Sequence, residues 1–63
     1  MALVAGYTRQ TDGAYIVIGN YDSPSLAETA IADDTSSDVK EYWIASSINP
    51  ENDTPFILGT IDV

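Results

Sequence analysis

The sequence predicts one small, mainly β domain over residues 1–63, with four strands in two antiparallel hairpins and at most one short helix between them. Three observations lead to this prediction. The apolar residues gather in four runs rich in Val, Ile and aromatic residues, which are types favoured in strands. Turn-forming residues separate the runs within each pair. Only the stretch between the two pairs has helical spacing.

The first hairpin is expected from two strands, Leu3 to Arg9 and Ala14 to Tyr21. The Asp12-Gly13 pair between them favours a type I′ turn, in which both central residues take positive φ. A turn at this place sets Tyr7 opposite Ile18. Because the second strand is apolar on both faces, we expect it to lie in the centre of the sheet.

The short helix is expected between residues 23 and 33. Asp22 or Ser23 can cap its first turn, and a proline follows, where a missing N–H costs nothing. Two turns of helix are not stable alone in water, so the segment has to dock on the sheet. Its apolar face predicts docking through Leu26 and Ile31.

The second hairpin is expected from strands at Val39 to Ile48 and at Phe56 to Val63. A polar loop with two prolines separates them, and proline stops both strands from extending into it. Tyr42 and Trp43 are neighbours in the third strand, so their side chains point to opposite faces of the sheet.

Composition excludes several classes of function. The chain carries two Lys or Arg against ten Asp or Glu, a net charge of −8, with no His and no Cys. Nucleic acids and anionic membranes are therefore disfavoured as direct partners. Disulfides and a Cys/His zinc site are impossible, and the usual catalytic bases and nucleophiles are absent. We expect no enzyme, no catalytic residue and no cofactor.

Calcium is the metal that such a chain is best suited to bind, since hard oxygen ligands are plentiful. Neither of the two acidic segments has the glycine and the bidentate glutamate of an EF-hand loop. Asp-rich turns are ordinarily solvated turns, so we expect no metal site. The two segments contain Asp33, Asp34 and Asp38 in one case and Asn49, Glu51 and Asp53 in the other.

No apolar run approaches the ~18 residues that a membrane span needs. The first residues lack the basic segment of a signal peptide, and their apolar stretch is short. We therefore expect a protein made in the cytoplasm without Sec export.

The aromatic residues predict where the chain makes contact with protein. A chain of this length buries only about 60% of the surface that its unfolded form exposes, and one short helix covers one face of a sheet. Either the sheet wraps into a barrel-like monomer, or a partner protein or another copy covers the second face. Trp43 is the expected core anchor by size, and the side of Tyr42 and Ile44 the expected docking surface. The full set of predicted interface residues is Tyr42, Ile44, Trp43, Tyr7 and Phe56.

In small size, acidity, β-richness, abundant Ser, Thr, Asp and Asn and scarce Lys, the composition resembles that of minor virion components and small acidic phage inhibitors. The first hypothesis is a non-enzymatic structural or assembly protein of a viral particle, which docks strands and aromatic residues onto copies of itself or onto a larger protein. Its basis is a core too small for the apolar strands, together with two apolar strands, Leu3 to Tyr7 and Ile57 to Val63, that can add to another sheet by edge pairing. The alternative is an acidic inhibitor that occupies the basic cleft of a nucleic-acid enzyme by charge mimicry. A third interpretation takes the acidity as adaptation to high salt or as a means of solubility.

Overall fold

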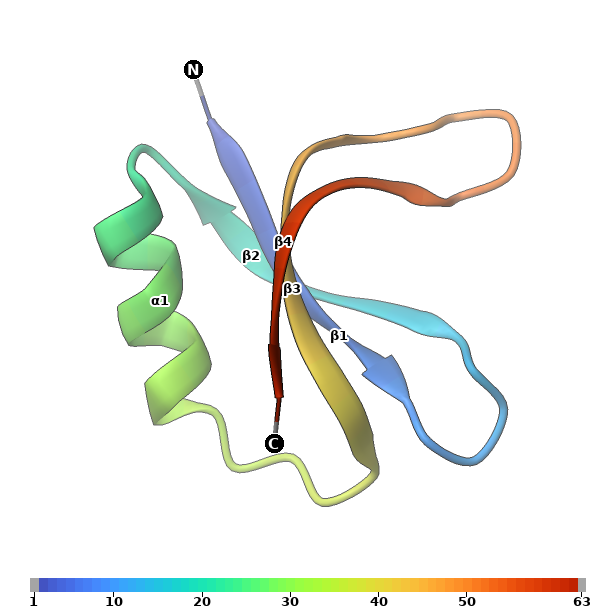
Figure 1. The fold of residues 1–63 in the computed structure, drawn as a ribbon. Helices are drawn as coiled ribbons and strands as arrows, with labels where there is room; N and C mark the ends of the chain where they lie inside the picture. Colours follow the sequence, from blue (N-terminus) through green and yellow to red (C-terminus); the bar gives the residue numbers. More distant parts are fainter. Residues whose placement is uncertain (1, 63) are drawn as a thin grey trace.

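The computed structural model describes residues 2–62 and confirms the predicted fold, four antiparallel strands in one sheet with one short helix (Figure 1). The spatial order of the strands is β2-β1-β3-β4. The helix lies on one side of the sheet, and both hairpin turns extend away from it (Figure 1). The elements are β1 (Leu3–Arg9), β2 (Tyr15–Tyr21), α1 (Pro24–Asp33), β3 (Val39–Ile48) and β4 (Pro55–Asp62).

The prediction that the second strand is central was wrong, because β1 and β3 are central and β2 is an edge strand. The small residues of β1 explain its position. Ala5 is fully buried beneath the helix, and Gly6 lies against the Trp43 indole on the opposite face. A strand that is approached closely on both faces needs small side chains, and β1 has them.

The predicted register of the first hairpin was also wrong. Tyr7 pairs with Ile16, not with Ile18, and a β-bulge shifts the register between Ala5 and Gly6. The cause is a longer loop. Two further polar residues, Gln10 and Thr11, join Asp12-Gly13 between the strands, so the strands begin to pair further from the tip.

The turn of the first hairpin is a four-residue loop, and the prediction of a type I′ turn was wrong. The N–H of Gly13 donates to the carbonyl of Arg9 at 2.8 Å, and the N–H of Arg9 donates to the carbonyl of Ala14 at 2.8 Å. Within this loop only Gly13, at φ 72°, takes positive φ, whereas a type I′ turn needs two such residues. Asp12 does not take positive φ, and its side chain accepts a hydrogen bond from the Ala14 N–H at 3.1 Å.

The second hairpin closes with the same turn. The N–H of Asp53 donates to the carbonyl of Asn49 at 2.9 Å, and the N–H of Asn49 donates to the carbonyl of Thr54 at 2.9 Å. Asp53, at φ 55°, occupies the place that Gly13 has in the first turn. Asn52 occupies the place of Asp12, since its side-chain oxygen accepts from the Thr54 N–H at 3.2 Å.

The helix begins as predicted but docks differently. The Ser23 side chain caps it by accepting a hydrogen bond from the Leu26 N–H at 3.3 Å. Leu26 itself is 53% exposed, so the prediction that it docks was wrong. Ile31 is buried as predicted, and Ala27 is buried in place of Leu26, because residues four apart lie on the same helix face and Leu26 lies to one side of it.

Two apolar clusters hold the sheet, one on each face. The cluster on the helix side contains Ala5, Ala27, Ile31, Val39 and Tyr42. The cluster on the other face contains Val4, Trp43 and Ala45, with Ile48 packed against it. Trp43 is fully buried, and among the described residues none accepts a hydrogen bond from its Nε1. The indole is therefore held by packing, and the twisted sheet supplies most of the cover that the helix does not.

Candidate docking edge

The outer edge of β4 is the most exposed apolar part of the described chain. Every residue from 56 to 61, which we call the β4 edge, is exposed although it belongs to a strand. No charged residue interrupts the segment from Pro55 to Ile61. Its large side chains are Phe56, 51% exposed, Ile57, 41%, Leu58, 65%, and Ile61, 37%.

A β-bulge interrupts the pairing of β4 with β3 at Leu58. Ile57 pairs with Ala45 and Gly59 pairs with Ile44, so Leu58 is the extra residue between two adjacent pairs. An extra residue bends its strand and increases the local twist. A second register shift follows between Ala45 and Ile48, towards the hairpin tip. The two irregularities account for the curvature of β4 over the sheet (Figure 1).

The other edge strand, β2, is anchored on both faces. Ile18 and Tyr21 are half-buried and pack against the helix-side cluster. Tyr15 is 43% exposed but packs edge-on against Trp43, with ring centroids 6.2 Å apart. The helix packs on β1, β2 and β3, so its cover favours the β2 side of the sheet.

The structure separates the residues that sequence reasoning placed at an interface. Tyr42 is only 8% exposed, and its hydroxyl donates to a carboxylate oxygen of Asp34 at 2.8 Å. Tyr7 packs edge-on against it, with ring centroids 6.0 Å apart, and Ile44 is half-buried in the same cluster. These residues therefore hold the helix on the sheet.

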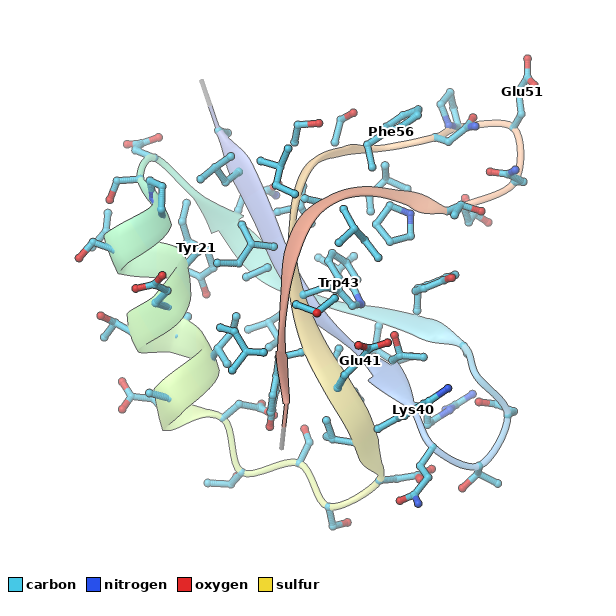
Figure 2. The ribbon with its side chains drawn as sticks, in the orientation of Figure 1. Tyr21, Lys40, Glu41, Trp43, Glu51 and Phe56 are labelled. Carbon is cyan, nitrogen blue, oxygen red and sulfur yellow. The ribbon has the colours of Figure 1, made fainter. Side chains whose placement is uncertain are left out.

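Trp43 lies inside the opposite cluster, and Phe56 lies out on the β3–β4 hairpin (Figure 2). The structure thus brings Tyr7, Tyr42 and Ile44 together and leaves Phe56 with a different set of neighbours. Of the β4 edge, the set of predicted interface residues contains Phe56 alone and lacks Ile57, Leu58 and Ile61, although their strand was expected to be able to add to another sheet. The signal for them is the uncharged run from residue 55 to 61, combined with the position of its strand at an edge.

The Tyr42–Asp34 hydrogen bond shifts the pKa of both groups. Burial raises the pKa of Asp34, but hydrogen bonds from the Tyr42 hydroxyl and from Ser36 outweigh it and leave this pKa below its usual value. The same bond, together with burial, raises the pKa of Tyr42. At neutral pH a charged carboxylate therefore accepts from a protonated phenol, which is a stronger bond than one between neutral groups.

The ends of the β4 edge are acidic. Glu51 is exposed at the hairpin tip (Figure 2), and Asp53 in the same turn is exposed as well. At the far end the register places Asp62 opposite Glu41, with the exposed Lys40 next in sequence. The other cation, Arg9, forms two hydrogen bonds to Asp12, at 2.8 and 2.5 Å. Neither end of the edge therefore has more than one cation among its carboxylates.

The two acidic segments considered for calcium serve as hydrogen-bond acceptors within the chain. Asp38 accepts from the backbone and hydroxyl of Thr11, at 3.1 and 2.6 Å, and Asn49 accepts from the Glu51 N–H at 2.9 Å. Over residues 2–62 no three metal-ligating side chains come together, and no pocket is enclosed. In the same range no helix has the length and apolarity to cross a membrane.

No protein-family model, no curated protein and no solved structure matches this chain. The function is therefore argued from the geometry and charge of the β4 edge.

Proposed function

We propose that this chain is a non-enzymatic structural or assembly protein, which docks onto another polypeptide through the β4 edge. The observation that supports this most is the exposure of Phe56, Ile57, Leu58 and Ile61 on one edge strand. The assembly that the composition suggests is a viral particle, so the protein would act in a virion after synthesis in the cytoplasm. The proposal places docking on β4 and not on the side of Tyr42 and Ile44, because those two residues pack within the protomer.

An edge strand has unpaired backbone N–H and C=O groups on its outer side, and a further strand can add to them. Soluble proteins usually protect such edges with charged side chains, proline or a covering loop. Between Phe56 and Ile61 the β4 edge carries no charge and no proline. The main-chain bonds of an added strand supply affinity, and exposed side chains such as Leu58 supply selectivity.

The test uses a neutral ten-residue peptide of alternating Val and Thr with blocked termini as the added strand. Its affinity is measured by calorimetry for the wild type, for Leu58→Lys and for Val17→Lys. Val17 is a matched control, because it is an apolar residue 49% exposed on the other edge strand. Unfolding curves establish that each variant folds.

Docking at β4 predicts that Leu58→Lys reduces the affinity about tenfold or more, since lysine at an edge opposes strand addition, while Val17→Lys leaves it nearly unchanged. Equal losses in both variants, or no binding to the wild type, would contradict the proposal.

Charge mimicry, the alternative function, predicts a different response to salt. Binding of an acidic inhibitor to a basic cleft weakens steeply as the salt concentration rises, whereas strand addition with a neutral peptide is nearly indifferent to it. The affinity of the chain for its ligand is therefore measured at 0.05 and 0.5 M NaCl, about a tenfold range of ionic strength. A steep loss at high salt indicates charge mimicry, and a nearly constant affinity indicates strand addition.

A further inference from the structure

The charges around the β4 edge restrict what can occupy it. Carboxylates lie at both ends of an uncharged segment, Glu51 and Asp53 at the hairpin tip and Glu41 at the other end. At about 3.3 Å per residue, the six residues of the edge span about 20 Å. A strand added along this length has the exposed carboxylates of the tip at one end and Glu41 at the other, across β4 at two strand spacings or about 10 Å.

A second copy of the chain is a poor occupant in either direction. Antiparallel pairing of two β4 strands places the tip of each copy, with Glu51 and Asp53, beside the Glu41 end of the other. Parallel pairing places tip beside tip. Lys40 is next to Glu41, and each copy has a net charge of −8. The other cation, Arg9, lies on β1 and is paired with a carboxylate of the first turn. Like charges set side by side at an interface oppose association.

We infer that the occupant of the β4 edge is an extended segment of a different protein, with apolar residues at alternate positions and Lys or Arg at both ends. This inference rests on the proposed function and specifies the partner. The apolar positions contact side chains such as Leu58 and Phe56, and the terminal cations meet the acidic ends of the edge. The alternating apolar side chains let the partner segment pack along the β4 edge. The acidic ends of the edge disfavour both a second copy of the chain and acidic segments of other proteins.

The experiment compares two probes on the intact chain. One is a ten-residue peptide with a central alternation of Val and Thr and two Lys at each end. The other has two Glu in place of each pair of Lys. Affinities are measured by calorimetry at 0.05 M NaCl, and the native mass of the chain alone is measured over a hundredfold range of concentration.

The expected result is that the Lys peptide binds about tenfold or more tightly than the Glu peptide and that the chain alone stays monomeric. The double variant Glu51→Gln with Asp53→Asn should reduce this preference, and Asn tolerates the positive φ at residue 53. A matched double variant, Asp22→Asn with Glu28→Gln, removes the same charge at the exposed α1 end and should retain the preference.

Two results would overturn the inference while the proposed function stands. One is equal affinity for both peptides, with each still lost in Leu58→Lys. The other is a dimer of the chain alone that Leu58→Lys dissociates, because the occupant is then a second copy. Failure of the Lys peptide, the Glu peptide and the neutral peptide alike would end the proposed function itself.

Discussion

Gly13 and Asp53 occupy the same place in two copies of one turn, yet the hairpins that they close differ in how their outer strands are covered. Side-chain hydrogen bonds stabilise the first turn, one from Arg9 to Asp12 and one from the Thr11 hydroxyl to Asp38. Its outer strand, β2, packs against the helix-side cluster and Trp43.

In the second hairpin the side-chain hydrogen bonds lie within the turn itself. Its turn is held by backbone bonds and by the side chains of Asn49 and Asn52, and its outer strand is exposed from residue 56 to 61. The same turn therefore closes two hairpins whose outer strands are covered differently. The outer strand of the first hairpin, β2, packs against the protomer, and the outer strand of the second, β4, stays open.

The largest expected difference is between the covered strand and the open strand of the second hairpin, and its aromatic residues show it: Trp43 and Tyr42 lie on β3, and Phe56 lies on β4. Trp43→Ala should cost about 3–5 kcal/mol, which approaches the whole stability of a domain of this size, ~3–9 kcal/mol. Tyr42→Ala should also unfold the protomer, since it removes a buried ring and leaves Asp34 without its donor. Phe56→Ala should cost less than about 1 kcal/mol, because half of that ring is already exposed. Urea unfolding checks all three, and a Phe56→Ala cost as large as that of Trp43→Ala would contradict the comparison.

A pair of glycines sharpens the contrast between inner and outer strands. A Cβ at Gly6 would lie 2.5 Å from Cζ2 of Trp43, so Gly6→Ala should cost about 1–3 kcal/mol by overpacking. A Cβ at Gly59 on β4 meets no atom within 4 Å, and Gly59→Ala should be neutral or stabilise the strand by roughly 0.5 kcal/mol. Thermal unfolding of both variants is the check. Similar losses in the two would mean that β4 is packed as tightly as β1.

The two turns should respond in opposite directions to substitution. Gly13→Val should destabilise the protein by about 1–2 kcal/mol, because a β-branched residue resists positive φ. Asp53→Gly should stabilise it by about 0.5 kcal/mol, because glycine adopts the positive φ of residue 53 without the steric cost that aspartate has there. Chemical unfolding measures both changes, and wild-type stability in Gly13→Val would show that the turn has been misplaced.

Acid should weaken the first turn more than the second. The hydrogen bond from Arg9 and the N–H of Ala14 lower the pKa of Asp12 from 3.8 to about 2. A depressed pKa stabilises the fold above the unfolded value, and this stabilisation is lost as the pH falls through the folded value. Asn52, at the same place in the second turn, does not titrate.

The measurement for this smallest effect is urea unfolding of the wild type and of Asp12→Asn at pH 5 and at pH 2. The wild type should be the more stable at pH 5, and the difference should shrink at pH 2. A difference that stays constant would mean that the ionised Asp12 does not stabilise the fold.

Local patterns were sufficient to predict the strands and the helix. β1 and β3 have the predicted bounds, and α1 begins and ends within a residue of its prediction. Alternation, proline and a capping serine act within a few residues, so they can be recognised in one segment. The turn type was less accessible, because an Asp-Gly pair fits both a two-residue turn and the end of a four-residue loop.

Strand order and burial depend on pairs far apart in the sequence. β2 is apolar on both faces, which favours a central strand, but contacts from α1 and Trp43 cover it at an edge. Tyr42 was expected at the surface because nothing near it in the sequence shows that the helix covers it. The exposure of β4 follows from its place in the order β2-β1-β3-β4, which no single segment encodes.

The most direct test of the open β4 edge is a titration of the isotope-labelled chain with the Lys-flanked peptide, followed by NMR at every backbone amide. The structure predicts that the amides of residues 56–61 shift and become protected from exchange, while those of β2 and α1 stay in place. Shifts centred on β2, or spread evenly over the protein, would contradict the proposal that this protein binds a partner through β4.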